Sequence, residues 1–492
     1  MKKLIIVLLL LASGSFVFGQ ATIYKEKLYA PGLKDSVSYT VYVPQDWEGW
    51  DAERLHPTIY AINYGMINGD YVAAQVAYFR KARYAMPNSL IVVVDASMER
   101  MGYQYKTGEV TAEGHQFITF LKELLIPAIT QKYHTSGFRS YLGHSFAASF
   151  GSYLIRTEPG LFNGYLLLAP EKVGTEAPFR LPEKVLSELD RQYTFVYSAV
   201  GQKDLQRRKD FAREIYKEMS RVQAEHRFLQ MDTIVRADHT NILTLAFEFG
   251  LEHIYQFYTP YSGKKESDAF ADLQQVAGTI KRYYGLDLEH NFTFYSPFVH
   301  EAIENKDSAA LEKILAYFDV PGLKGWNLMQ FGEACLQLND RGAAARCFAK
   351  AIDLITKQEM NASSGPPNLL VCYRHMAFDI YPEDHEKAWG YLINAKNLME
   401  SGNKWVQNDG DALLDLGAYA ARAGYRADEA LNYLMAYQQG HHERNYKAAY
   451  YAALICQRVG KPEDAKKYIR LAVQENATDP DTAALARELG IH

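Results

Sequence analysis

The chain has 492 residues, more than one hydrophobic core usually organises, so we expect two or more domains. Hydrophobic residues make up 48% and charged residues 23% of it, a globular composition that excludes wholesale disorder. The formal net charge of -5 argues against nucleic acid or an anionic membrane surface as a partner, because both call for clustered Lys and Arg.

The first residues predict a secretory signal peptide at 1–19. Lys2 and Lys3 precede an apolar run at 4–12, and Gly19 is the expected last residue before cleavage. The run is shorter than the roughly 20 residues that span a bilayer, so we expect no membrane span after cleavage. These features predict an exported protein, periplasmic or extracellular.

Residues 20–258 predict an α/β domain. Apolar and polar residues alternate over 37–43, which predicts an antiparallel first strand at one edge of a sheet. Later strands read as short, almost continuous apolar runs, as expected when both faces are covered: 58–62, 90–94, 165–168 and 195–200. Helical patterns lie between them at 114–130, 146–156 and 209–224. Strands alternating with helices predict a mostly parallel sheet.

The pattern changes after residue 258. Residues 259–267 are rich in turn-forming and charged residues and predict a linker, and helical patterns then follow one another to residue 492. Seven residues have the spacing of a helix-turn-helix repeat, with small residues where two helices approach closely: Leu328, Phe331, Gly332, Cys335, Ala344, Phe348 and Ala351. The pattern resembles a tetratricopeptide repeat, and unevenly spaced copies follow it. We expect a helical domain that either binds a protein or peptide partner or only packs against the first domain.

Neither a metal nor a cofactor is indicated. The four cysteines, Cys335, Cys347, Cys372 and Cys456, fall in apolar helical patterns, where a buried thiol behaves as a small hydrophobic group. Their spacing does not match CxxC metal motifs, and the 14 His include no HExxH pair. Core packing is the favoured role for these cysteines.

Ser145 lies where an apolar strand at 138–142 meets a helical pattern at 146–156. A serine at such a junction is held on a tight turn that lifts its hydroxyl above the sheet. In the GxSxG motif the glycines leave room for this turn; here Gly143 is present and Ala147 takes the second glycine position. The strand-turn-helix context therefore predicts a nucleophile.

Asp204 and His239 follow Ser145 in the order expected for a hydrolase triad. Asp204 comes after the strand that ends near residue 200, and His239 lies in a loop before a helix. Asp204 can instead cap the following helix, and Asp238 and Glu171 are alternative acids. His144, next to the serine, is more consistent with a structural role.

An oxyanion hole needs two fixed N–H donors. The backbone N–H of Phe146, directly after the serine, is the first candidate. The backbone N–H of Tyr64, in the loop after the strand at 58–62, is the second, with Gly65 as the next choice.

The segment GFRSYLGHSFAASFGSYLIRTEPGLFNGYLLLAP, with VGQKDL and ADHTNI further on, resembles the esterase family of α/β-hydrolases related to esterase D. That family includes feruloyl, acetyl xylan and siderophore esterases. The resemblance covers roughly residues 22–258 and implies an α/β-hydrolase fold. Two positions depart from the family pattern: Ala147-Ala148 replace glycines, and Asn63-Tyr64 replace the Asp-Gly after the third strand.

Two functions from different classes follow. The first is an exported serine ester hydrolase that uses Ser145, His239 and Asp204 on carbohydrate-linked or siderophore-type esters. The second is a catalytically weakened hydrolase fold that acts as a scaffold through its helical domain. Tyr64, Tyr103 and Tyr105 either line the mouth of the cleft or serve as ordinary packing residues.

Overall fold

The computed structural model describes residues 21–44, 55–83, 85–104, 109–172, 178–259, 268–288, 292–319, 323–407, 411–440 and 445–491. The predicted signal peptide and most of the predicted linker lie outside these residues, as do Tyr105 and the side chain of Tyr103. The chain forms two compact units. Within the described residues, the first unit runs to residue 259 and includes 271–288, and the second contains 268–270 and the residues from 292 onward.

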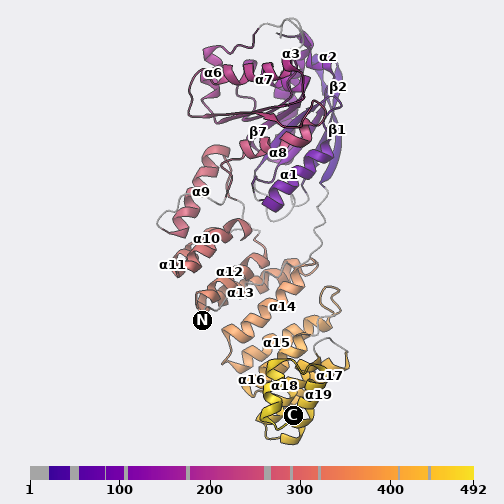
Figure 1. Cartoon of the computed structure of the whole chain (residues 1–492), viewed down its shortest axis with the longest axis vertical. Helices are drawn as coiled ribbons and strands as arrows, with labels where there is room; N and C mark the ends of the chain where they lie inside the picture. Colours follow the sequence, from indigo (N-terminus) through magenta and orange to yellow (C-terminus); the bar gives the residue numbers. More distant parts are fainter. Residues whose placement is uncertain are drawn as a thin grey trace. The chain divides into compact units, whose positions relative to one another are not determined.

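The first unit is built on an eight-stranded sheet with the order β1-β2-β4-β3-β7-β8-β9-β10 (Figure 1). The strands from β3 onward pair in parallel, and β1 and β2 join them antiparallel. Their bounds are β1 Thr22–Ala30, β2 Asp35–Val43, β3 His56–Asn63, β4 Leu90–Asp95, β7 Thr135–His144, β8 Gly164–Leu168, β9 Thr194–Gly201 and β10 Arg227–Ile234. The mostly parallel α/β sheet predicted from the sequence is confirmed.

The edge of the sheet differs from the prediction. The strand expected there, at 37–43, forms β2 and lies one place inside, because β1 pairs along its whole length. Charged residues Lys25, Glu26 and Lys27 in the middle of β1 mask its strand pattern, which suits an exposed edge. Residues Tyr103–Gln104 (β5) and Glu109–Val110 (β6) form a separate two-stranded ribbon.

Helices cover both faces of the sheet. Phe117, Phe150 and Phe211 pack with Tyr141 and Tyr165 in one core, and α8 approaches the other face, where its Gly250 lies against Leu166. The helices of this unit are α1 Gly69–Arg83, α2 Met98–Met101, α3 Ala112–Thr119, α4 Ile126–Tyr133, α5 Phe146–Thr157, α6 Glu183–Leu189, α7 Gln206–Met219, α8 Ile242–Ile254 and α9 Ala269–Tyr284. A 3-10 turn, η1 (Pro31–Leu33), and a π-helical segment, η2 (Phe120–Leu125), complete it.

Helix α9 follows the predicted linker, yet most of it packs on the first unit. The Tyr284 hydroxyl accepts a hydrogen bond from the Phe257 N–H and donates one to the Ile254 carbonyl, both at 3.0 Å. The Tyr284 ring also packs edge-on against Phe138 at 5.1 Å. These contacts bury the end of α9 against the sheet.

The second unit is all-helical in its described residues (Figure 1). Gly332 and Gly417 let neighbouring helices approach closely, since a Cβ there would lie 2.7 Å from Phe348 and 2.3 Å from Leu434. The elements are α10 Phe292–Glu304, α11 Ser308–Phe318, α12 Gly325–Gln337, α13 Arg341–Leu354, η3 Ile355–Glu359, α14 Gly365–His375, η4 Met376–Ile380, α15 His385–Glu400, α16 Asp411–Ala423, α17 Ala427–Gln439, α18 Asn445–Arg458, α19 Pro462–Glu475 and α20 Pro480–Glu488. The four cysteines are buried here as free thiols.

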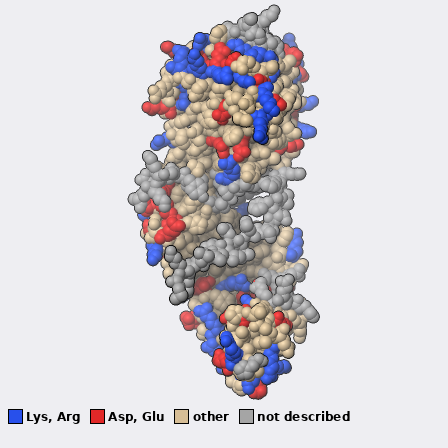
Figure 2. Space-filling model, in the orientation of Figure 1, with Lys and Arg blue, Asp and Glu red and all other residues tan. Residues whose placement is uncertain are grey.

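Basic and acidic side chains are interspersed on the described surface that Figure 2 shows. Within the described part of the chain, no helix is both long and apolar enough to cross a bilayer.

Candidate active site

Ser145 occupies a strained turn between β7 and α5. Its φ of 56° and ψ of -119° are unfavourable for a residue with a side chain, and such strain is typical of functional sites. The Ser145 N–H donates to the Leu168 carbonyl of the neighbouring strand at 2.9 Å, which ties the turn to the sheet. A Cβ at residue 143 would lie 2.6 Å from the backbone of Ala147, so Gly143 is required. Ala147 itself is fully buried in the first turn of α5.

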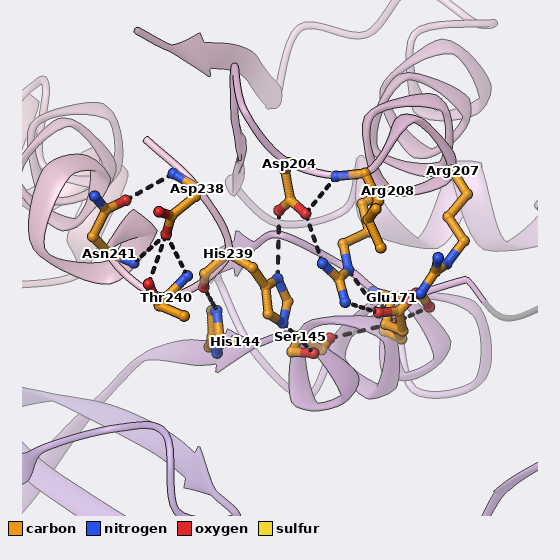
Figure 3. Close-up of polar contacts among 12 residues, drawn as sticks. His144, Ser145, Glu171, Asp204, Arg207, Arg208, Asp238, His239, Thr240 and Asn241 are labelled. Carbon is orange, nitrogen blue, oxygen red and sulfur yellow. Dashed lines mark hydrogen bonds and ion pairs between the residues drawn. The ribbon is translucent and has the colours of Figure 1, made fainter. Parts of the chain in front are cut away.

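The structure brings Ser145, His239 and Asp204 together (Figure 3). His239 Nε2 lies 3.0 Å from Ser145 Oγ, and His239 Nδ1 lies 3.4 Å from Asp204 Oδ2. Ser145 and Asp204 are buried, whereas His239 is partly exposed. The three residues follow β7, β9 and β10, at the carboxyl ends of parallel strands of one sheet in which β8 lies between β7 and β9.

Close packing of two loops sets the distance between Asp204 and His239. A Cβ at Gly201, the last residue of β9, would lie 2.4 Å from the Ala237 carbonyl oxygen. The Lys203 N–H donates to that same carbonyl at 2.9 Å. Only glycine at 201 allows this approach, which places the Asp204 carboxylate against the His239 ring.

Two arginines form ion pairs with the carboxylates beside His239. Arg208 Nη1 donates to Asp204 Oδ1 at 2.7 Å, and its Nε donates to Glu171 at 2.6 Å. Arg207 Nε donates to the other Glu171 oxygen at 2.9 Å. The carboxylate side chains of Asp204 and Glu171 are 1% and 3% exposed, so both are desolvated and depend on these partners. Arg208 is not among the residues predicted from the sequence, although it lies four residues after Asp204 at the start of α7.

The alternative acids have other partners. Glu171 pairs with Arg207 and Arg208, as described above. The Asp238 carboxylate accepts hydrogen bonds from the Thr240 hydroxyl at 2.7 Å and from the Thr240 N–H at 2.8 Å. These hydrogen bonds hold the pKa of Asp238 below its usual value. Asp238 therefore shapes the turn that carries His239. Asp204 lies one residue before Leu205, the N-cap residue of α7, and its Oδ1 accepts the Leu205 N–H at 2.7 Å.

His144 lies against His239, with ring centroids 4.7 Å apart. Burial, with a smaller effect from the neighbouring His239, lowers the pKa of His144 to about 4, so its ring is neutral at neutral pH. His144 Nε2 lies 2.8 Å from the His239 carbonyl oxygen. Because a carbonyl oxygen only accepts, Nε2 carries the proton and donates to it. His144 thus holds the backbone of the loop that presents His239.

The electrostatic environment keeps His239 neutral. Burial lowers the pKa of His239 first, and the positive charge of Arg208 lowers it further; the Asp204 carboxylate opposes both effects. A neutral ring that donates Nδ1–H to Asp204 leaves Nε2 free to accept the Ser145 proton.

The loop after β3 faces the start of α5. Ile62 of β3 pairs with Gly143 of β7, which brings the residues after Asn63 toward Ser145. Asn63 Oδ1 accepts the Gly65 N–H and the Ile67 N–H, both at 2.9 Å, so Gly65 is already engaged. Among the backbone–backbone hydrogen bonds of the described turns and loops, none has the Tyr64 N–H as its donor. The same described region contains no group of three or more His, Cys, Asp or Glu that could hold a metal ion.

The family model described as "Putative esterase" matches residues 30–232. Among solved structures, an uncharacterised protein from Capnocytophaga ochracea DSM 7271 is similar, with a TM-score of 0.51 and 16% identity over 67% of this chain and 94% of that chain. An IroE-like serine hydrolase from Shewanella oneidensis aligns with a TM-score of 0.48 and 14% identity over 60% of this chain and 99% of that one. No curated protein matches the chain. The likeness to the Capnocytophaga ochracea structure shows a shared fold.

Proposed function

We propose that this chain is a serine-type carboxylic ester hydrolase and that Ser145, His239 and Asp204 are its catalytic residues, a proposal supported by the match of residues 30–232 to the esterase family model. The observation that carries the proposal is the continuous contact from Asp204 through His239 to Ser145, at 3.4 and 3.0 Å. Acid, base and nucleophile need this geometry to activate a hydroxyl.

In the proposed reaction, Ser145 Oγ attacks the ester carbonyl carbon while His239 Nε2 takes the hydroxyl proton. Asp204 accepts the hydrogen bond from Nδ1–H and stabilises the imidazolium that forms. The negative charge that develops on the carbonyl oxygen is stabilised by the N–H groups of Phe146 and Tyr64. When the intermediate collapses, the C–O bond to the alcohol breaks and His239 protonates the departing oxygen. Water, activated by the same histidine, then releases the acid from the acyl-enzyme and returns the proton to Ser145.

Hydrolysis of p-nitrophenyl acetate by the purified full chain tests these roles. Ser145→Ala should reduce turnover by several orders of magnitude, because no other group replaces the nucleophile. Asp238→Asn is the matched control, since that carboxylate serves the turn and not the His239 ring. A Ser145→Ala variant that hydrolyses the ester as fast as the parent would contradict the proposal.

For the substrate, we infer carbohydrate-linked or siderophore-type esters outside the cytoplasm. The inference rests on the sequence resemblance to feruloyl, acetyl xylan and siderophore esterases and on the apolar N-terminal segment. Comparing kcat/KM for acetyl, feruloyl and macrolactone esters tests the substrate class. Export is tested by the mass of the mature protein, which should begin at Gln20. Equal, slow hydrolysis of all three ester classes would contradict the inferred substrate class. An intact N-terminus on the mature protein would contradict export.

A further inference from the structure

The side chain of Tyr64, and not only its backbone, lies beside the proposed nucleophile. Tyr64 directly follows β3, and the parallel register that pairs Ile62 with Gly143 brings position 64 alongside Ser145. Its ring packs against the Phe146 ring, with centroids 6.1 Å apart and an interplanar angle of 60°. Both side chains are half-buried against the core of the first unit, so the phenol is held at the edge of the site.

The Tyr64 ring lies against Phe146, next to Ser145, and these are the two residues that an ester carbonyl has to approach. Burial raises the pKa of Tyr64, while hydrogen bonding with the Ser145 side chain and with the Phe146 backbone opposes that rise. The net direction is upward, so the hydroxyl keeps its proton at neutral pH. A protonated phenol within reach of the nucleophile and of the first oxyanion donor is itself a hydrogen-bond donor to any negative charge that forms there.

We propose that Tyr64 is a catalytic residue. Its hydroxyl and the Phe146 N–H together donate hydrogen bonds to the carbonyl oxygen of the substrate as this oxygen becomes negative. The proposal rests on the proposed function, because it needs Ser145 to attack an ester. This role also gives a chemical meaning to Asn63-Tyr64, which stand where the family pattern has Asp-Gly. Asp-Gly has no hydroxyl at this position, whereas Tyr64 brings one to the oxyanion.

The surrounding loop explains why a side chain can take this task. The Asn63 carboxamide oxygen accepts the N–H groups of Gly65 and Ile67, so two of the loop's backbone donors are already engaged. The same hydrogen bonds fix the turn from which the Tyr64 side chain emerges. Phe146 supports the ring from the helix side. The hydroxyl is therefore preorganised, which is the condition for a donor to favour the transition state.

Tyr64→Phe removes only the hydroxyl and keeps the ring, its packing on Phe146 and the backbone N–H. With p-nitrophenyl acetate we expect kcat to fall about 10²- to 10³-fold, the loss typical of one oxyanion donor, while KM changes by less than about 3-fold. Binding of a trifluoromethyl ketone, which forms an oxyanion on the serine, should weaken by a similar factor. Tyr71→Phe is the matched control, because Tyr71 donates its hydroxyl to the Thr244 carbonyl at 3.2 Å and should leave kcat unchanged.

The outcomes separate this inference from the proposed function. If the parent hydrolyses the ester, Ser145→Ala is inactive and Tyr64→Phe keeps the parental kcat, then the Tyr64 role is wrong and the esterase assignment stands. A Tyr64→Phe variant with higher kcat/KM would also overturn the role, because the hydroxyl would then obstruct the oxyanion hole. A folded parent without ester hydrolysis would overturn both. An unchanged melting temperature for Tyr64→Phe shows that the loss is chemical and not structural.

Discussion

Replacing Arg208 by Met should destabilise the first unit more than the same change at its neighbour Arg207. Arg208 is 13% exposed and bridges the carboxylates of Asp204 and Glu171, which are 1% and 3% exposed. Arg207 is 47% exposed and reaches only Glu171. Methionine keeps most of the side-chain volume, so the two variants differ mainly in the ion pairs that they remove.

The size of the effect follows from burial. Removing one partner of a buried ion pair typically costs 3–5 kcal/mol, because the charge left behind stays desolvated. Glu171 retains Arg207 and Asp204 retains the Leu205 N–H, so we expect the lower end, about 3 kcal/mol. For a domain of this size, 1 kcal/mol shifts Tm by roughly 2–4 °C, which predicts a fall of roughly 6–12 °C. Arg207→Met should cost no more than about 1 kcal/mol, as for an exposed pair.

Differential scanning calorimetry of the full chain measures both shifts, and the transition of the first unit is the one that should move. Arg208→Met should also move the acidic limb of the kcat/KM profile to higher pH, because the positive charge that lowers the pKa of His239 is gone. Equal Tm shifts in the two variants would refute the assignment of Arg208 as the buried bridge.

Three further results are expected. In the parent, kcat/KM should rise with pH through a midpoint below 6.5, since the base must be neutral and the pKa of His239 is lowered; a midpoint above 6.5 would contradict the stated electrostatics. Asp204→Asn should reduce kcat by about 10³- to 10⁴-fold in steady-state assays while Asp238→Asn stays close to the parent, and the reverse ranking would make Asp238 the acid. Gly143→Ala should lower the free energy of unfolding of the first unit by about 1–3 kcal/mol in thermal unfolding, because a Cβ there would lie 2.6 Å from the backbone of α5. Gly137→Ala, where a Cβ meets open space, is its control, and equal stability of the two variants would argue against the tight turn at the serine.

The parts of the fold that were predictable carry their signal locally. Strands β3, β4, β8 and β9 are covered on both faces and read as continuous apolar runs, which is why the parallel sheet was recognisable. β1 is not predictable in the same way, because an exposed edge strand tolerates charges where a buried strand has apolar residues. Helix α9 shows the same limit, since helical periodicity gives an apolar face but not the unit against which Tyr284 packs.

The candidate site also has some residues that the sequence predicts and others that only the folded structure reveals. Ser145, Asp204 and His239 stand in an order and at strand ends that the sequence displays, so the sequence alone predicts them. The pairing of Glu171 with Arg208 joins a loop after β8 to α7, and only the folded sheet brings these residues together. For Tyr64 the sequence indicated the backbone N–H. The direction of the phenol depends on the turn that Asn63 fixes, which local pattern does not encode.

Labelling with a fluorophosphonate tests the central claim most directly, because this reagent reacts with an activated serine whatever the natural ester is. We predict one adduct per chain, located by peptide mass spectrometry on Ser145, absent from Ser145→Ala and formed much more slowly in His239→Ala. A folded parent that forms no adduct at Ser145 would contradict the account, and would favour a protein that keeps the hydrolase fold as a scaffold.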